Sequence, residues 1–334
     1  MRLKQVVIGG PREDQQWRGI PSIERSPGGR LFVSWFSGGK IEPEETNRVY
    51  LQTSDDDGQS FSEPIVRCDP EGKTRAFDPC LWFDPRGRLW YIYNVGNREE
   101  NQHGVWAQCC SEPDAPQLQW SEPKRLGFDV PFSFRSNKPT VLSTGEWLLP
   151  VTWAEDTRGD WFAGDRQLQG CAISEDEGET WTLHGAVKAP SWALECMFME
   201  LHKGDVRMYT RCGGGVIDES LSRDRGRTWS EARPTTITNP GSRFFVRLLA
   251  SGRWLLINSP DPKARTGMVA MLSEDEGRTW SAPLMLDERT NISYPDACQT
   301  AEGLIYAVHD RERQGAMEVL LSVFSEQDIV PGLP

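Results

Sequence analysis

The chain has 334 residues and a net charge of -12, and this acidic balance argues against a nucleic-acid partner, which would need a basic surface. Its 14 tryptophans and 31 glycines suit many short strands joined by tight turns. Nothing near Met1 resembles a signal peptide, and no run approaches the ~18 apolar residues of a membrane span. We therefore expect a cytoplasmic protein without a membrane partner, although a secreted chain that had lost its leader would look the same.

The cysteines and histidines do not follow the spacing of a metal site. The eight cysteines contain no C-x-x-C pair and lie mostly in apolar, strand-like runs. The four histidines lack spacings such as H-E-x-x-H. Buried free thiols account for this cysteine pattern. We expect neither a metal ion nor a cofactor.

Six turns that contain glycine, each between two apolar runs, follow one another along the chain. Short apolar runs on both sides of a tight turn are typical of β-hairpins. The turns contain Gly29, Gly87, Gly145, Gly204, Gly252 and Gly303, at intervals of 48 to 59 residues. A period of this size indicates a repeat architecture. We predict an all-β fold, a six-bladed β-propeller of four-stranded antiparallel blades that forms one domain over residues 1–334.

A second phrase, Ser-x-Asp-x-Gly-x-Ser/Thr followed by an aromatic residue, accompanies four of the hairpins. It begins at Ser54, Ser174, Ser222 and Ser273. In a four-stranded blade it falls between the third and fourth strands, where Asp and Ser satisfy turn amides and Gly supplies a positive φ. The second blade has a degenerate copy over 111–120 and the sixth has none. We expect residues 4–8 to close the ring by pairing into that last blade.

Ionisable residues recur at one offset before the glycine turns. Nine positions before their turns lie Asp78, Glu195, Arg243 and Tyr294. Because the innermost strands of a propeller begin beside the axis on one face, these side chains should converge there. Arg18 lies two positions from this register, and Lys138 and Asp310 add charge at the same end. The sequence predicts a polar site on the face opposite the Asp-containing turns.

These residues resemble the sialidase (neuraminidase) superfamily of six-bladed propeller exo-glycosidases, and the similarity covers nearly the whole chain. Arg18-Gly19-Ile20-Pro21 is similar to that family's Arg-Ile-Pro motif with one residue inserted, and Asp78-Pro79 looks like its second-blade Asp-Pro. The resemblance implies that Arg211 and Arg265 complete an arginine triad with Arg18. It also implies that Glu195 and Tyr294 form the catalytic pair.

The chemistry of these residue types agrees with that resemblance. Three guanidiniums can hold a sugar carboxylate through planar, charge-assisted hydrogen bonds, and Arg243 could take the place of Arg265. A tyrosine with a pKa near ~10 needs a base to act as a nucleophile, and Glu195 could be that base. We expect an exo-acting hydrolase whose substrate is a glycan or small sugar with a carboxylate. It would retain configuration through a glycosyl-tyrosine intermediate.

The general acid departs from the family pattern. Sialidases place an Asp in the loop after the first hairpin, whereas this loop offers Glu42, Glu44 and Glu45 and no Asp. One of these, or Asp78, could protonate the leaving group. Two other interpretations remain: a glycosidase or lyase for another sugar such as a uronic acid or deoxy sugar, and a non-catalytic glycan-binding propeller. The presence of both Glu195 and Tyr294 favours an enzyme.

Overall fold

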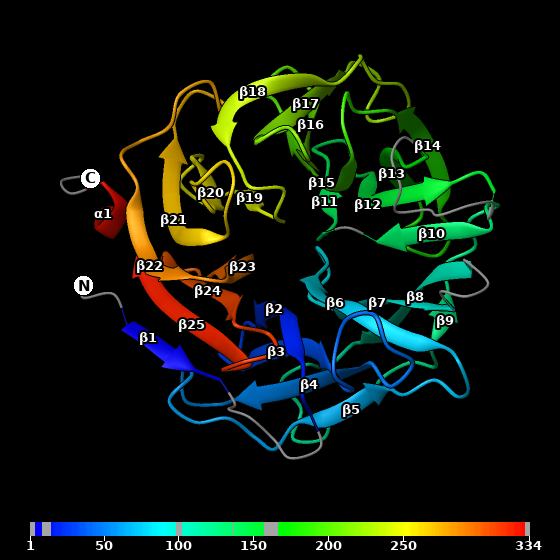
Figure 1. Ribbon diagram of the computed structural model, residues 1–334, viewed down its shortest axis with the longest axis vertical. Coiled ribbons are helices and arrows are strands. Elements are labelled where there is room, and N and C mark those ends of the chain that lie inside the picture. Colours follow the sequence, from blue (N-terminus) through cyan, green and yellow to red (C-terminus); the bar gives the residue numbers. More distant parts are fainter. Residues whose placement is uncertain (1–3, 9–14, 98–101, 136, 157–165, 331–334) are drawn as a thin grey trace.

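A computed structural model describes residues 4–8, 15–97, 102–135, 137–156 and 166–330. Their strands form sheets arranged in a ring around a common axis, with the innermost strand of each blade next to that axis (Figure 1). Blade 1 consists of β2 (Arg18–Arg25), β3 (Leu31–Ser37), β4 (Arg48–Ser54) and β5 (Ile65–Cys68). The predicted all-β propeller with six blades is confirmed.

Blades 2 and 3 share one nine-stranded sheet. Blade 2 consists of β6 (Arg75–Phe83), β7 (Leu89–Asn97), β8 (Gln102–Cys110) and β9 (Lys124–Arg125). Blade 3 consists of β10 (Phe132–Arg135), β11 (Thr140–Val141), β12 (Trp147–Ala154), β13 (Leu168–Ser174) and β14 (Thr182–Val187). A parallel pairing of Phe132 with His103 joins β10 to β8 and so merges the two blades.

Blades 4 and 5 are regular four-stranded meanders. Blade 4 consists of β15 (Ala193–Glu200), β16 (Val206–Cys212), β17 (Val216–Ser222) and β18 (Arg233–Thr238). Blade 5 consists of β19 (Phe245–Leu248), β20 (Trp254–Asn258), β21 (Thr266–Ser273) and β22 (Leu284–Thr290).

Blade 6 contains strands from both ends of the chain. It consists of β23 (Ile292–Gln299), β24 (Leu304–Arg311), β25 (Glu318–Ser325) and β1 (Lys4–Val7), and the short helix α1 (Glu326–Ile329) follows β25. Lys4 pairs with Val323 and Val7 with Leu320 in an antiparallel ladder. The expected closure by residues 4–8 is confirmed, and the edge of β25 is covered by a paired strand. Among the described residues, no helix has the length and apolar character needed to cross a membrane.

The Asp-containing turns stabilise the blades and do not line the axis. In the first, the Ser54 hydroxyl donates to Asp56 at 2.7 Å and accepts from the Gly58 amide at 2.9 Å. Asp56 also accepts from the Ser60 hydroxyl at 2.6 Å. These bonds satisfy turn amides that would otherwise need water. All four turns lie between the last two strands of their blades; in blades 1, 4 and 5 these are the third and fourth strands, as predicted.

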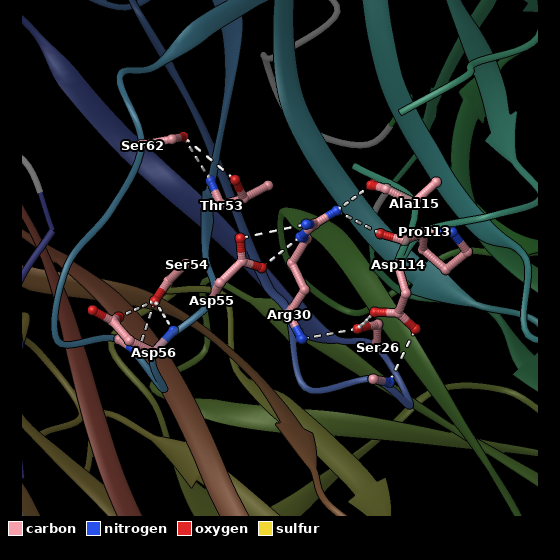
Figure 2. A network of polar contacts seen from close by, with 12 residues as sticks. Ser26, Arg30, Thr53, Ser54, Asp55, Asp56, Ser62, Pro113, Asp114 and Ala115 are labelled. Carbon is pink, nitrogen blue, oxygen red and sulfur yellow. Dashed lines mark hydrogen bonds and ion pairs between the residues drawn. The ribbon is translucent and has the colours of Figure 1, made fainter. Parts of the chain in front are cut away.

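The degenerate turn of blade 2 binds blade 1 instead. Figure 2 shows Asp114 meeting the Ser26 hydroxyl and the Gly28 amide of the β2–β3 hairpin. Arg30 donates to the carbonyl of Ala115 at 2.6 Å and to Asp55 of its own blade at 2.6 Å. Loss of the repeated phrase at this blade therefore coincides with a polar contact between blades.

Aromatic side chains fill the space between neighbouring blades. The ring of Trp147 in blade 3 lies 4.9 Å from that of Trp82 and 6.0 Å from that of Trp90 in blade 2. Trp181, which closes the second Asp-containing turn, joins this cluster at 6.4 Å from Trp147. The edge-to-face pairs of Trp147 with Trp82 and Trp90 add to the free energy gained by burying their large apolar area.

Candidate active site

Four innermost strands carry a β-bulge at the predicted point of convergence. The ladders of β2, β6, β15 and β23 lose register there. Each bulge contains one residue with a left-handed φ: Ile20, Asp78, Glu195 and Tyr294, with φ values of 58°, 47°, 60° and 54°. Left-handed φ is uncommon for such residues, and bulges redirect side chains near functional sites. The blade 1 residue in this register is thus Ile20, two positions beyond Arg18.

Tyr294 lies among four arginines. Its side chain is only 6% exposed, and its hydroxyl accepts a hydrogen bond of 2.8 Å from Nη1 of Arg211. The guanidinium carbons of Arg211, Arg243, Arg265 and Arg313 lie 5.6, 4.6, 5.4 and 4.3 Å from the ring centroid. Burial raises the pKa of Tyr294, and the nearby cations only partly oppose this effect. The phenol is therefore protonated at neutral pH.

Arg211 connects Tyr294 to Glu195. The same Nη1 that donates to Tyr294 also forms an ion pair with Oε2 of Glu195, which is 1% exposed. Its Nε donates to the carbonyl of Gly241 at 2.7 Å. Burial lowers the pKa of Arg211, but Tyr294 and Glu195 outweigh it and raise that pKa overall. The predicted base and nucleophile are thus held beside one shared nitrogen.

Arg265 differs from its neighbours in its partners. Its Nη1 donates to the neutral Ser293 hydroxyl at 3.3 Å. Within the described part of the chain, no carboxylate lies within salt-bridge distance of it. Burial lowers the pKa of Arg265; Tyr294 and Asp310 oppose this effect in part, and the nearby cations Arg313 and Arg211 lower the pKa further. This half-buried guanidinium is therefore available to an anionic ligand.

Asp310 and Ser293 hold Arg313 in place. Ser293 precedes Tyr294 in β23, and Asp310 lies in the neighbouring strand β24. Nε of Arg313 donates to Asp310 at 3.0 Å and its Nη2 to Ser293 at 2.9 Å. Asp310, fully buried, also accepts from the Ser293 hydroxyl at 2.7 Å and from the Ile20 amide at 2.8 Å. Asp310 was predicted to bind substrate; in the structure its carboxylate positions Arg313 and Ser293.

A pocket of about 470 Å³ lies next to this cluster. Its lining residues include Trp17, Arg265, Ser293, Glu312 and Arg313. Two of the four arginines around Tyr294 thus face a space in which a small sugar ring could lie. Within the described residues, no three His, Cys, Asp or Glu side chains are grouped so as to hold a metal ion.

Two of the expected substrate-binding residues lie elsewhere. Arg18 is 1% exposed, its guanidinium lies 5.4 Å from the ring centroid of Trp35, and its Nη2 donates to Gln15 at 2.8 Å. Lys138 is 3% exposed and forms ion pairs of 2.7 Å with Glu24 and 3.2 Å with Asp296. Lys138 therefore connects blade 3 to the innermost strands of blades 1 and 6.

The candidates for the general acid separate clearly. Oε2 of Glu42 lies 3.4 Å from Nη1 of Arg313, so this side chain reaches the cluster. Glu44 turns back to accept from the Lys40 amide in its own loop, and Glu45 is exposed. Asp78 is buried in the bulge of β6. Glu42 is the one of the three loop glutamates that meets the arginines around Tyr294.

Ser293 and Arg313 received no individual role from the sequence. In a regular strand, the side chains of Ser293 and Tyr294 would point to opposite faces of the sheet. The bulge of β23 places both side chains beside the arginines. For Arg313, the available signal is its place three residues after Asp310, just beyond β24. Neither bulge geometry nor loop path follows from residue type alone.

The ring of blades and the bulged inner strands define a six-bladed β-propeller. The chain belongs to the BNR repeat-like domain family, whose model matches residues 15–307. A sialidase of Bacteroides fragilis (strain YCH46) is 23% identical over 292 residues, which are 76% of this chain and 52% of that relative. The chain thus spans about half the length of the curated relative it matches.

Solved structures with low sequence identity share the fold. A Hadza microbial sialidase, Hz136, superposes with a TM-score of 0.79 at 19% identity, covering 95% of this chain and 67% of its own. A protein of unknown function from Dyadobacter fermentans DSM 18053 gives 0.77 at 17% identity, covering 97% and 99%. Trypanosoma rangeli sialidase, solved in complex with sialic acid, gives 0.76 at 15% identity, covering 98% and 59%.

Proposed function

We propose that this protein is an exo-acting glycoside hydrolase that releases a terminal acidic sugar, with sialic acid the first candidate. The observation that carries this proposal is Arg265, a half-buried guanidinium beside Tyr294 whose hydrogen bond goes to a neutral hydroxyl. Burying a cation without a counterion is costly, so an anionic group on the ligand stabilises this arrangement. A sugar carboxylate matches the planar donors of arginine. The similarity of this chain to a sialidase of Bacteroides fragilis and to a sialidase structure in complex with sialic acid supports this choice.

The reaction proceeds by double displacement. Because the Tyr294 oxygen accepts from Arg211, the phenol keeps its own proton for Glu195. As Glu195 takes that proton, the Tyr294 oxygen attacks the anomeric carbon and the bond to the leaving oxygen breaks. Water then cleaves the glycosyl-tyrosine bond, and configuration is retained. A neutral phenol also avoids the repulsion that a carboxylate nucleophile would meet from an anionic sugar.

A panel of fluorogenic sialoside, uronide and rhamnoside substrates tests this function. One of the two acidic substrates, the sialoside first, should be hydrolysed, and Tyr294→Phe should lower kcat by at least about 1,000-fold because the nucleophile is lost. Tyr306→Phe is the matched control, since that phenol lies in the same blade beside Asp57 of an Asp-containing turn. Unchanged turnover in Tyr294→Phe would contradict the mechanism.

Glu42 takes the role of general acid in this proposal. It protonates the leaving oxygen in the first step and activates water in the second. Glu42→Gln should lower kcat/KM by about 100-fold or more on a sialylated oligosaccharide, whose leaving group needs a proton. An aryl sialoside with an acidic leaving group should lose much less. Equal losses on both substrates, or an equal loss in the exposed control Glu71→Gln, would exclude Glu42 as the acid.

A further inference from the structure

We infer that Arg313, and not Arg18, supplies the third guanidinium of the carboxylate-binding site, together with Arg211 and Arg265. This inference rests on the proposed function, because it assigns a contact to the carboxylate of the proposed substrate. It changes which residue of this chain determines acidic-sugar specificity. The sequence motif alone points to Arg18.

The inserted residue Gly19 explains why Arg313 takes the place of Arg18. Neighbouring side chains on a strand point to opposite faces, so one inserted residue reverses the direction of the side chain before it. A Cβ placed on Gly19 would lie 2.8 Å from Oδ2 of Asp310 and 2.9 Å from Cδ of Arg313. A side chain at position 19 would therefore point toward the site. Arg18 points the other way, toward Trp35 and Gln15. The aliphatic part of Arg313 fills the space that a side chain at position 19 would take.

The network around Arg313 fixes its guanidinium in a binding geometry. Asp310 and Ser293 hold Nε and Nη2, and Nη1 faces Glu42 at 3.4 Å. Ser293 accepts from Arg265 as well, so one hydroxyl sets the spacing of two guanidiniums. A cation fixed in this way loses little conformational entropy when it binds a ligand.

Arg313 and Arg18 also differ in their access to the pocket. Arg313 and Arg265 both line the pocket of about 470 Å³, and the Arg313 side chain is 16% exposed. Its guanidinium carbon lies 4.3 Å from the Tyr294 ring centroid. Arg18 is 1% exposed and lies over Trp35. A carboxylate in the pocket can thus reach Arg313.

The test compares Arg313→Gln and Arg18→Gln on a fluorogenic sialoside and on its carboxamide analogue. Loss of a charge-assisted hydrogen bond should raise KM for the sialoside by about 10- to 100-fold in Arg313→Gln and by much less in Arg18→Gln. On the carboxamide, Arg313→Gln should cost less than about threefold, because the anionic partner is already absent. Arg313→Lys keeps the charge but not the planar guanidinium, so its KM for the sialoside should lie between those of the wild type and Arg313→Gln.

Gly19→Ala provides a second, independent variant. Its new Cβ would displace Asp310 and Arg313, so KM should rise in the same direction as in Arg313→Gln. The matched control is Gly127→Ala, where a Cβ meets nothing within 4 Å. Thermal melting and circular dichroism verify that each variant is folded.

The outcomes separate this inference from the proposed function. Equal losses on sialoside and carboxamide in Arg313→Gln, or a larger KM increase in Arg18→Gln, would overturn the inference while hydrolysis stands. If the wild type hydrolyses no glycoside but binds N-acetylneuraminic or glucuronic acid in calorimetry, the hydrolase proposal fails. The affinities of the same variants for that acid then decide the role of Arg313. A wild type that neither hydrolyses nor binds any of these compounds overturns both.

Discussion

Two cations, the buried Lys138 and the half-buried Arg265, have opposite surroundings. Lys138 has carboxylates of Glu24 and Asp296 at 2.7 and 3.2 Å and donates to the carbonyl of Ile23 at 2.5 Å. Arg265 meets the neutral Ser293 hydroxyl, and its charged neighbours around Tyr294 include further arginines. The first cation is compensated inside the protein, whereas the second is placed where a ligand can compensate it.

This difference distinguishes a cation whose charge is balanced by carboxylates of the protein from one whose charge is not. From the sequence, both residues were expected at the substrate-binding end of the blades. The raised pKa of Lys138, where burial is outweighed by Asp296 and Glu24, indicates a charge that contributes to stability. The lowered pKa of Arg265, caused by burial and by like charges, indicates a charge that costs stability until a ligand binds. Substitutions at the two positions should therefore act on different properties.

Lys138→Met should have the largest effect on stability. Removing the ammonium leaves Glu24 and Asp296 buried without their main counterion, and breaking a buried pair in this way costs about 3–5 kcal/mol of unfolding free energy. Urea unfolding measures this loss, with Lys203→Met at an exposed position as the control. A loss below about 1 kcal/mol would remove the contrast between the two cations.

Arg265→Met should act on substrate binding and leave stability nearly unchanged. It relieves repulsion among the arginines, so the unfolding free energy should stay within about 1 kcal/mol of wild type or rise. KM for the acidic substrate should rise by about 10-fold or more. Steady-state kinetics and urea unfolding of one preparation measure both quantities, with exposed Arg278→Met as the control. Destabilisation comparable to that of Lys138→Met would show that Arg265 is structural.

Most of the fold could be predicted because its signals are local. A glycine turn between two apolar runs specifies a hairpin wherever it occurs, and six copies at similar spacing specify the ring. The missing fourth strand in blade 6 even predicted that β1 pairs with β25. The link between β8 and β10 and the contact of Asp114 with the β2–β3 hairpin were not predictable, since each joins segments far apart in the sequence.

The candidate site could be predicted only up to the direction of its side chains. Counting from the glycine turns selected Glu195 and Tyr294, which the structure places beside Arg211. Lys138 was added as a charge at the same end of the blades, because position in the sequence says nothing about which carboxylates lie opposite. Arg18 shows the sharper limit, since a single inserted residue such as Gly19 reverses the direction of a strand side chain. Contacts between blades carry the information that residue type and spacing lack.

The smallest expected effect concerns the Asp-containing turns, which belong with Lys138 on the structural side of this comparison. Hydrogen bonds from Ser60 and Ser54 lower the pKa of Asp56 to about 2, against about 3.9 for an Asp in an unfolded chain. Its contribution to stability is therefore complete above pH ~4 and is lost as the pH falls toward 2. The melting temperature of Asp56→Asn should depend less steeply on pH across this window than that of wild type. Exposed Asp129→Asn serves as the control, and parallel curves for wild type and Asp56→Asn would contradict a stabilising role for this carboxylate.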